Sequence, residues 1–465
     1  MTEATNLLVI VLDALREDAV EPSLEDSGRC FKARTCISSA PWTLPSCTSL
    51  ITGVDTFRHR HFWHADPPVS SNLVRALPDR YRKVGLVNNT VLLPASGLDQ
   101  GFDRWTYMDD HSEPFERAAR AIGRARRRRP LFLLLHSNIP HDYYRPQAGA
   151  YYDEAFPDRA GGACILGNRV IRWSGTTAAE REAVARTYRA SAMKAMAHTR
   201  EILDLVRARD DFVSVIVSDH GEGCQYDLGR VHHGGRVHDD LLRVPLYVDL
   251  PSTVGDARKQ DVADALATKV LSTTDVLPTL MALVGAQAVP GVDGVAVERV
   301  PEERVVVSED RRYLYLKNRF RLNVRGLGKN MSESDREENR LLTDQLAGAP
   351  IVRSYRSKTA KLIMTCLQLR AGQGSTAEDR DTLRELGQRL LGSPALVASG
   401  DRLYGFELFD LERDPSEQEN LLGSGSDGLE LLRAKPWTTM VTAPVADGDG
   451  DEVPVATILE SAERM

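Results

Sequence analysis

The chain has 465 residues, of which 42% are hydrophobic and 27% charged, and its formal net charge at pH 7 is -7. This length exceeds what one hydrophobic core usually organises, so we expect a large domain with a smaller companion. The composition is ordinary for a globular enzyme. The negative charge gives no chain-wide attraction to polyanions, which excludes nucleic acid as the default partner.

The most apolar segments are far too short to cross a membrane. They are Asn6 to Leu12 and Leu131 to His136, whereas a spanning helix needs about 20 apolar residues. The first segment follows MTEAT, without the basic start and the cleavage site of a secretory signal. The six cysteines show no spacing typical of a disulfide framework or a zinc knuckle. These features predict a cytoplasmic protein with reduced thiols and no membrane partner.

Short apolar segments alternate with longer amphipathic segments through the first two thirds of the chain. This alternation is typical of an α/β fold in which helices cover both faces of a central sheet. The predicted elements, in chain order, are a strand at Leu7 to Leu12, a helix at Leu44 to Thr52, a strand at Val84 to Val87, a helix at Pro114 to Arg127, a strand at Leu131 to Leu135, a helix at Ala178 to Arg207, strands at Phe212 to Val217 and Pro245 to Val248, and a helix at Thr274 to Val284.

Two stretches depart from this alternation. Tyr143 to Ser174 is rich in Tyr, Gly, Arg and Pro, and we interpret it as a long insertion that shapes a substrate pocket. The run RARRRRP, from Arg124 to Pro130, is either the solvated end of a helix or a patch for polyanions. Cations at a helix C-terminus interact favourably with the helix dipole, so the pattern favours the solvated helix end.

The pattern changes beyond about residue 345. Two-residue alternation in IVRSYRS, AKLIMTCLQL and YGFELFDL predicts a small antiparallel sheet, with one helix from Ala377 to Leu391. The tail from Ala443 contains ADGDGDE and is predicted to be partly disordered. We therefore predict a main domain over residues 1–345, an α+β subdomain over 346–442 and an acidic, flexible tail over 443–465.

Polar residues follow three of the predicted strands. Asp13 ends the first apolar run, Asp219 and His220 follow another, and His141 comes shortly after a third. Ligands of open α/β sheets bind beyond the carboxyl ends of the strands, so these residues are candidates for a site. An adjacent carboxylate and imidazole suit a divalent metal, and Gly221 lets the backbone leave the strand sharply. Asp13 taken alone is equally well explained as a helix cap.

Thr43 stands immediately before a helical run that has Pro45 in its first turn. Its hydroxyl has two interpretations. As an N-cap, its oxygen accepts backbone N–H groups. As a nucleophile, it attacks phosphorus or sulfur after a metal lowers its pKa, while the helix terminus stabilises anionic oxygens. The local sequence favours the cap, and the other motifs of the chain favour the nucleophile.

Seven segments match the landmarks of one protein family in the family's order. They are VIVLDALRED, PWTLPSCTSLITG, LFLLLHSNIPHDYYRP, IVSDHGEG, HDDLLRVPLYV, STTDVLPTLMALVG and ELFDLERDPSEQENLL. The chain thereby resembles, over nearly its whole length, the sulfatase family of the alkaline phosphatase superfamily. The resemblance implies a sandwich with a large, mostly parallel central sheet flanked by helices, a smaller C-terminal antiparallel sheet with a helix, and a catalytic domain over residues 1–345.

The resemblance also implies a metal centre. Asp13, Asp219 and His220 would bind a divalent metal, with the Thr43 oxygen as a further ligand and as the nucleophile. Aspartate and histidine ligands suit zinc or manganese, with calcium or magnesium as alternatives. We expect one or two ions per chain.

Further histidines match family positions with less definite roles. His141 and His233 correspond to residues that bind a second metal or the anionic oxygens of the substrate in different branches. His232 stays an alternative to His233, because the match needs a gap of one residue. His136 matches a recurrent family histidine. Its position at a strand end fits a structural role at least as well as a role in the site.

Departures from the family pattern bear on the reaction. Formylglycine-dependent sulfatases need a Cys or Ser followed at fixed spacing by Pro and Arg, and here the positions hold Thr43, Pro45 and Cys47. Threonine cannot become that aldehyde, and the arginine is absent. A second Asp is missing as well, because Ala14 follows Asp13. Cys47 lies about one helical turn beyond Thr43, which makes a buried structural thiol its predicted role.

A threonine nucleophile is typical of phosphodiesterases, phosphonate-processing enzymes and phosphoethanolamine transferases of the superfamily. We therefore predict a metal-dependent phosphoester hydrolase or phosphotransferase that acts on a small phosphodiester, phosphomonoester or phosphonate ester through Thr43. His141 or His233 would stabilise the substrate oxygens or hold a second cation. Two alternatives stay open: a sulfate ester hydrolase without formylglycine, and a catalytically silent binding protein. The sequence does not distinguish hydrolysis of the ester from transfer of the phosphoryl group to an acceptor. It is also compatible with a homo-oligomer.

Overall fold

The computed structural model describes residues 5–20, 23–25, 28–64, 66, 72–126, 129–144, 147–155, 178–225, 230–311, 351–368, 395–399, 402–422 and 430–431. The chain forms two compact units. The first comprises Met1–His233 and Asp239–Arg304, and the second comprises Gly234–His238 and Val305–Met465. The predicted boundary at residue 345 lies outside the described residues, and the division falls earlier, because strand β12 (Val306–Asp310) pairs with strand β13 (Ile351–Arg356).

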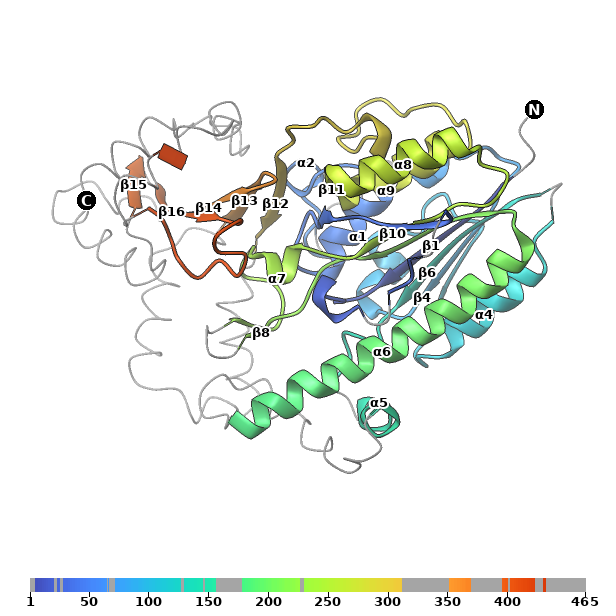
Figure 1. Cartoon of the computed structure of the whole chain (residues 1–465), viewed down its shortest axis with the longest axis horizontal. Helices are drawn as coiled ribbons and strands as arrows, with labels where there is room; N and C mark the ends of the chain where they lie inside the picture. The colour runs from blue at the N-terminus through green and yellow to red at the C-terminus, as the bar shows by residue number, and fades with distance from the viewer. Residues whose placement is uncertain are drawn as a thin grey trace. The chain divides into compact units, whose positions relative to one another are not determined.

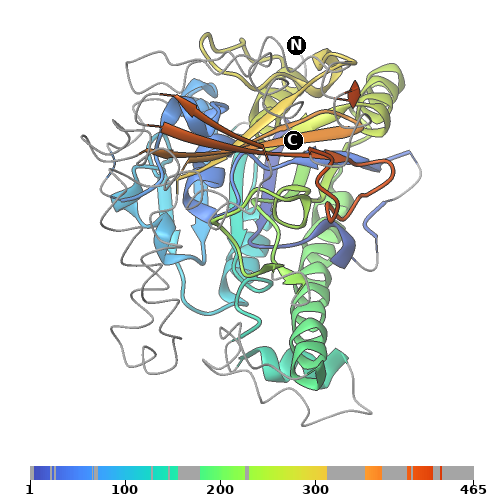
Figure 2. The ribbon, with the colours of Figure 1, turned by 90° about the vertical axis from the view of Figure 1, so that its left-hand side faces the viewer.

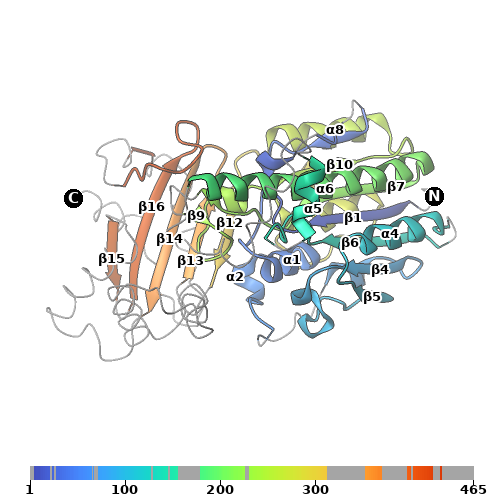
Figure 3. The ribbon, with the colours of Figure 1, turned by 90° about the horizontal axis from the view of Figure 1, so that it is seen from below.

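The described part of the first unit contains a seven-stranded sheet in the order β2-β10-β7-β1-β6-β4-β5. Figure 3 shows β5 at one edge of this sheet. Neighbouring strands are parallel from β7 to β5, and β10 runs antiparallel to β7 and β2. The predicted mostly parallel sheet is thereby confirmed, with its strands at β1 (Asn6–Leu12), β2 (Cys30–Lys32), β4 (Arg82–Val87), β5 (Arg104–Tyr107), β6 (Leu131–Ser137), β7 (Phe212–Ser218) and β10 (Leu246–Asp249).

Helices cover both faces of this sheet (Figure 1). Strand β1 shows why, since Val9 packs on one side with helix α1 and Ile10 packs on the other with helix α4. Strands buried on both faces are continuous apolar runs, which matches the sequences of β1, β6 and β7. The helices are α1 (Thr43–Thr52), α8 (Asp256–Thr268) and α9 (Val276–Leu283) with the first face, and α4 (Glu113–Gly123) and α6 (Ala178–Arg209) with the second.

The helices predicted for the first unit are present, with shifted ends. Helix α1 begins one residue earlier than expected, at Thr43, and α9 is preceded by a 3-10 turn, η6 (Thr273–Asp275). Helix α4 ends at Gly123 rather than at Arg127, which lies outside the described residues, and glycine is a poor helix former. None of the described helices is both long and apolar enough to span a lipid bilayer.

Shorter elements complete the first unit. Helix α5 (Gln147–Ala155) packs against α6, as Figure 2 shows. The predicted insertion from Tyr143 to Ser174 lies largely outside the described residues. The other short elements are η1 (Glu17–Ala19), β3 (Thr35–Ile37), α2 (Thr56–His59), α3 (Leu73–Ala76), η2 (Thr90–Leu92), η3 (Pro94–Ser96), β8 (Cys224–Gln225), β9 (Arg230–Val231), α7 (Asp239–Leu242), β11 (Val270–Ser272) and η7 (Val297–Arg299).

The second unit contains an antiparallel sheet in the order β12-β13-β14-β16-β15, which confirms the predicted C-terminal sheet. A buried ion pair joins Lys361 Nζ to Glu417 Oε1 at 2.8 Å within this unit. The predicted helix from Ala377 to Leu391 and the acidic tail over 443–465 lie outside the described residues. The remaining strands are β14 (Ala360–Gln368), β15 (Ala395–Ser399) and β16 (Arg402–Asp410).

Candidate metal centre

The register of three parallel strands brings the two predicted metal-binding aspartates together. Strand β1 lies between β6 and β7, and Leu12 pairs with Ser137 on one side and Ser218 on the other. The residues that follow these strands therefore emerge at one edge of the sheet. The amide of Ala14 donates a hydrogen bond of 3.1 Å to Asp219 Oδ1, which ties the turn after β1 to the end of β7.

Two backbone features fix this edge. Ala14 has a φ of 59°, in the left-handed region that residues with side chains seldom adopt, and its hydrogen bond to Asp219 stabilises that conformation. A Cβ atom on Gly221 would lie 2.1 Å from the carbonyl oxygen of Asp240, so only glycine fits there. Close packing, rather than a left-handed turn, explains the glycine after the Asp219–His220 pair.

Thr43 is the first residue of α1, and its hydroxyl faces the acidic end of the sheet. The cap position belongs to Trp42, and its side chain makes no capping hydrogen bond. Thr43 Oγ1 lies 3.3 Å from Asp13 Oδ2 and 3.3 Å from His220 Nε2. The observed partners of the hydroxyl are thus the predicted metal ligands, which favours the nucleophile over the N-cap interpretation.

The Asp13 carboxylate is surrounded by polar side chains. Asn89 Nδ2 donates a hydrogen bond of 2.7 Å to Oδ2, and His136 Nε2 lies 3.4 Å from the same oxygen. His220 Nε2 lies 3.3 Å from Oδ1. Burial opposes ionisation of Asp13, but the charge of His141 and the hydrogen bond from His220 outweigh it and keep its pKa well below the usual range. Asp13 is therefore an anion in this setting.

The second carboxylate lacks such compensation. Burial and the nearby charge of Asp13 raise the pKa of Asp219 to about 7. Burial also opposes protonation of His220, yet Asp219 and Asp13 raise its pKa above the ordinary value. Two acids enclosed at full burial favour a positive charge between them.

The donor atoms of this group fit a divalent cation. One ligand atom each from Asp13, Asp219 and His220 can be chosen so that all three lie within 4.8 Å of one another. Oxygen and imidazole nitrogen donors are the ligand types of zinc and manganese. These residues, with the Thr43 hydroxyl beside them, are called the metal centre below.

Cys47 is buried as predicted, and it lies next to the metal centre. Its Sγ is 3.8 Å from Asp219 Oδ2, and Cys47, His136 and Asp219 form a second group with ligand atoms within 4.8 Å. Burial and the charges of Asp219 and Asp13 raise the pKa of the thiol well above its usual value. Burial lowers the pKa of His136 to about 4, partly offset by Asp13, which keeps this imidazole neutral at pH 7.

The structure brings two further predicted histidines to the same place. The ring of His233 lies 4.7 Å from that of His220 and 5.0 Å from that of His141, measured between centroids. The side chains of His141 and His233 are 15% and 18% exposed, whereas those of Asp13, Asp219 and His220 are fully buried. Solvent therefore reaches the group on the side of these two histidines.

Carboxylates orient both of these imidazoles. His141 Nδ1 lies 2.9 Å from Asp142 Oδ1, and His233 Nδ1 lies 2.9 Å from Glu222 Oε2. Burial opposes protonation of His141, but Asp13 and Asp142 outweigh it and raise its pKa to about 9. A carboxylate at Nδ1 fixes the tautomer and the ring orientation, so Nε2 is the atom on the opposite side of each ring.

The structure separates His232 from His233. The backbone of His232 exchanges hydrogen bonds of 3.0 and 3.1 Å with Gly223, and its φ is 57°. The ring contacts with His141 and His220 are made by His233. The alternative left open by the sequence is thereby narrowed to His233 as the residue that lies in the group.

Four polar residues near the metal centre carry no assigned role in the sequence analysis. Glu222 and Asp142 stand inside the quoted motifs SDHGE and PHD, so their position beside predicted ligands was an available signal. Asn89 and His111 come from separate loops without a local motif. His111 Nε2 lies 3.1 Å from Asp142 Oδ2, which extends the chain of contacts behind His141.

Comparison with known proteins places the chain in a family. A family model described as Sulfatase matches residues 34–286, more than half of the chain. No curated protein matches the sequence. The span matched includes Thr43, Asp219 and His220.

Solved structures share the fold at low sequence identity. A protein solved in complex with its substrate D-glucosamine-2-N,6-O-disulfate aligns with a TM-score of 0.62 at 11% identity, covering 97% of this chain and 99% of that one. The phosphonate monoester hydrolase of Agrobacterium radiobacter aligns with a TM-score of 0.58 at 14% identity, covering 92% and 93%. The C-terminal periplasmic domain of EcEptC from Escherichia coli, in complex with Zn, aligns with a TM-score of 0.50 at 12% identity, covering 66% and 90%.

Proposed function

The chain belongs to the sulfatase family of ester hydrolases, and from this premise we propose that it is a metal-dependent phosphoester hydrolase or phosphotransferase with Thr43 as its nucleophile. One observation carries the proposal. The Thr43 hydroxyl, at the first turn of α1, lies 3.3 Å from both a carboxylate oxygen of Asp13 and a ring nitrogen of His220. An N-terminal helix turn also favours an anionic substrate group beside it.

The residue type at position 43 favours phosphate over sulfate. Threonine cannot be converted to the formylglycine of ordinary sulfatases, so the reaction must use the hydroxyl itself. A hydroxyl that attacks phosphorus forms an ester that water can later cleave. A neighbour of the same fold is a phosphonate monoester hydrolase, which supports phosphorus chemistry in this architecture.

The chain's own groups account for the remaining parts of the reaction. The Thr43 hydroxyl gives up its proton to water as Oγ1 forms its bond to phosphorus. The bond from phosphorus to the leaving oxygen breaks at the same time, and that oxygen takes up one proton from water, so that protons balance. Despite burial, Asp13 and Asp142 raise the pKa of His141 to about 9, which favours the imidazolium at neutral pH. It therefore stabilises the anionic oxygens, and His233 lies beside it. Water or an acceptor alcohol then cleaves the phosphothreonine.

Asp13, Asp219 and His220 would hold the divalent metal. When bound, such an ion lowers the pKa of the Thr43 hydroxyl and offsets charge on the substrate oxygens. The ligand types suit zinc or manganese. A Zn complex of a protein with this fold supports zinc as the first ion to test.

Parallel assays test the substrate class. Purified protein loaded with zinc or manganese is given p-nitrophenyl phosphate, bis(p-nitrophenyl) phosphate, p-nitrophenyl phenylphosphonate and p-nitrophenyl sulfate. We expect the highest kcat/KM on one of the phosphorus esters, and mass spectrometry of acid-quenched protein to find the phosphoryl adduct on Thr43. The Thr43→Ser variant, which retains a hydroxyl, is the matched control for adduct formation.

A sulfate ester hydrolase without formylglycine is the second candidate. The family match favours it, as does the neighbour solved with a sulfated sugar substrate. A clear preference for p-nitrophenyl sulfate would replace our proposal with this one. Equal rates in wild type and Thr43→Ala would remove the nucleophile from both.

A further inference from the structure

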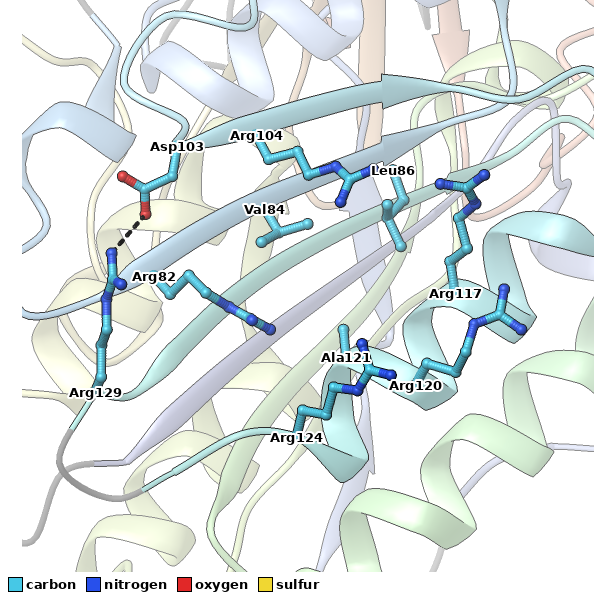
Figure 4. A pocket seen from close by; sticks show the side chains of 10 residues that line it. All are labelled: Arg82, Val84, Leu86, Asp103, Arg104, Arg117, Arg120, Ala121, Arg124 and Arg129. Carbon is cyan, nitrogen blue, oxygen red and sulfur yellow. Dashed lines mark ion pairs between the residues drawn. The ribbon is translucent and has the colours of Figure 1, made fainter.

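A cavity of about 430 Å³ lies beside β4, β5 and α4 of the first unit (Figure 4). None of its lining residues belongs to the metal centre. Three of them are apolar: Val84 and Leu86, 8% and 4% exposed, lie at the floor of the cavity, and Ala121 is partly exposed. The others are charged: Arg82, Asp103, Arg104, Arg117, Arg120, Arg124 and Arg129.

The fold explains why these arginines meet. Alternation along β4 places Arg82, Val84 and Leu86 on one face, and Arg104 of β5 pairs with Val84 and shares that face. On α4 the lining residues recur at helical spacing, from Arg117 through Arg120 and Ala121 to Arg124 at the C-cap, which puts them on one side of the helix. The cavity is therefore built mainly by two strands and a helix, and two of its arginines, Arg124 and Arg129, come from the arginine-rich run.

The cavity carries more positive charge than its acidic neighbours offset. Six arginines face one lining aspartate, in a chain whose net charge is -7. Arg117 pairs with Glu113 at 2.5 Å, while the Arg120–Glu116 and Arg129–Asp103 pairs are looser, at 3.5 and 3.7 Å. Among the described residues, Arg82 and Arg124 have no acidic partner, and the Arg104 guanidinium contacts only the Thr106 hydroxyl, at 3.2 Å. Like charges gathered this closely favour an anion between them.

We infer that this arginine cavity binds a nucleoside diphosphate or triphosphate. Guanidinium groups from the strand side, Arg82 and Arg104, and from the helix side, Arg120 and Arg124, surround the same hollow, as Figure 4 shows. Planar guanidinium groups bind phosphate oxygens in pairs and stack on aromatic rings. The guanidinium groups can therefore stack on the base while they bind the phosphates, and the narrow apolar floor of Val84, Leu86 and Ala121 lies beneath them.

The shape of the site favours a small ligand over a nucleic acid. Its volume falls in the range of about 300 to 1,000 Å³ typical of small-molecule pockets. Nucleic acids are instead bound along extended basic stripes that follow a phosphate backbone. Here the arginines surround one hollow between a helix and the edge of the sheet, which fits two or three linked phosphates.

Isothermal titration calorimetry with ADP tests this inference on the full-length protein. The binding variant is Arg82→Gln/Arg124→Gln. The matched control, Lys259→Gln/Arg299→Gln, removes two positive charges from α8 and η7, which pack with the opposite face of the sheet. We expect the Kd of ADP to rise at least about tenfold in the binding variant, since a charge-assisted hydrogen bond contributes roughly that factor or more, and to stay unchanged in the control. Adenosine and inorganic phosphate should each bind more weakly than ADP.

Further arms separate the cavity from the metal centre and from other polyanions. An Asp13→Asn protein should bind ADP like wild type, and loss of binding there would place ADP at the metal centre and overturn the inference. Tighter binding of a short oligothymidylate, lost in the binding variant, would overturn it in favour of a nucleic acid. Absence of ADP binding by the wild-type protein would also overturn the inference. The role of the arginines would then be to keep edge strand β5 from pairing with another chain. Should the first variant fail to fold, Arg104→Gln/Arg120→Gln repeats the test.

Discussion

The metal centre and the arginine cavity place opposite charges at two parts of one sheet. The metal centre lies at the carboxyl ends of β1 and β7, where both carboxylates and His220 are fully buried. The arginine cavity lies beside β4 and edge strand β5, and its arginine side chains keep much of their exposure, as Arg120 at 55% and Arg129 at 64% illustrate. The carboxylates of the metal centre therefore favour a cation in a buried setting, whereas the arginines of the cavity favour an anion close to solvent.

Burial decides how much each charge matters. Charges in a low-dielectric interior interact strongly and need a compensating partner, whereas exposed charges are screened by water and salt. Removing a group from the metal centre should therefore change activity or metal binding by orders of magnitude. Removing an arginine from the cavity should change its own ligand's affinity and little else.

The largest effect is expected for Thr43→Ala. Loss of the attacking oxygen should lower kcat on the preferred ester by about 10³-fold or more, while metal content stays at the wild-type level. Steady-state kinetics and elemental analysis of the same preparations measure both. Thr43→Ser should keep a substantial part of the rate, and a Thr43→Ala protein with wild-type kcat would show that another group performs the attack.

Asp13→Asn should weaken metal binding next most strongly. The asparagine keeps the shape of the side chain but removes the negative charge that faces His220 and Thr43. We expect the Kd of zinc, measured by competition with a chelator, to rise by more than about 100-fold. Substitution of a residue that only hydrogen-bonds to a metal ligand typically costs about tenfold to 100-fold in metal affinity. Asn89→Ala, which removes only the 2.7 Å hydrogen bond to Asp13 Oδ2, should show that smaller loss. Equal losses in the two variants would contradict Asp13 as a ligand.

Asp142→Asn tests the orientation of His141 through the pH profile. Burial lowers the pKa of His141, while Asp13 and Asp142 raise it to about 9. A group with a raised pKa is protonated below that value, so a rate that needs the imidazolium should hold at neutral pH and fall as pH rises through about 9. In the variant the fall should begin at lower pH, with kcat at pH 8 reduced roughly tenfold. An unchanged alkaline limb at unchanged metal content would assign that limb to another group.

The central strands could be predicted because a strand that is buried on both faces consists of consecutive apolar residues. NLLVIVL and LFLLLH correspond to β1 and β6 within a residue or two. Edge strands such as β2 (CFK) and β5 (RWTY) are short and lack such a run, so their pairing depends on contacts made only after folding. For the same reason the sequence could not predict that Arg82 and Arg104 lie near Arg124. The pairing of β4 with β5 brings these arginines together, and that pairing forms only on folding.

The sequence could predict that the proposed metal ligands lie together, but it could not predict the residues that support them. Asp13, Thr43, Asp219 and His220 stand in motifs with fixed order, and the parallel strands then place them together. Asn89 contacts Asp13 from a separate loop, 76 residues away in the sequence. No local sequence pattern predicts such a partner for a carboxylate. Such contacts are properties of the folded chain, which is also why His232 and His233 could be told apart only by their backbone and ring positions.

The smallest effect is expected for the stability of Arg82→Gln/Arg124→Gln without ligand. These arginines have no acidic partner among the described residues, so removing them relieves mutual repulsion within the cavity. Repulsion between exposed charges is worth less than about 1 kcal/mol and is screened by salt, so urea unfolding at low ionic strength should show a gain below that size which disappears at high ionic strength. Lys259→Gln/Arg299→Gln should show no salt-dependent gain. A large loss of stability in the arginine variant would mean that the two side chains stabilise the fold. The exposed cavity would then depend on its charges as the buried metal centre does.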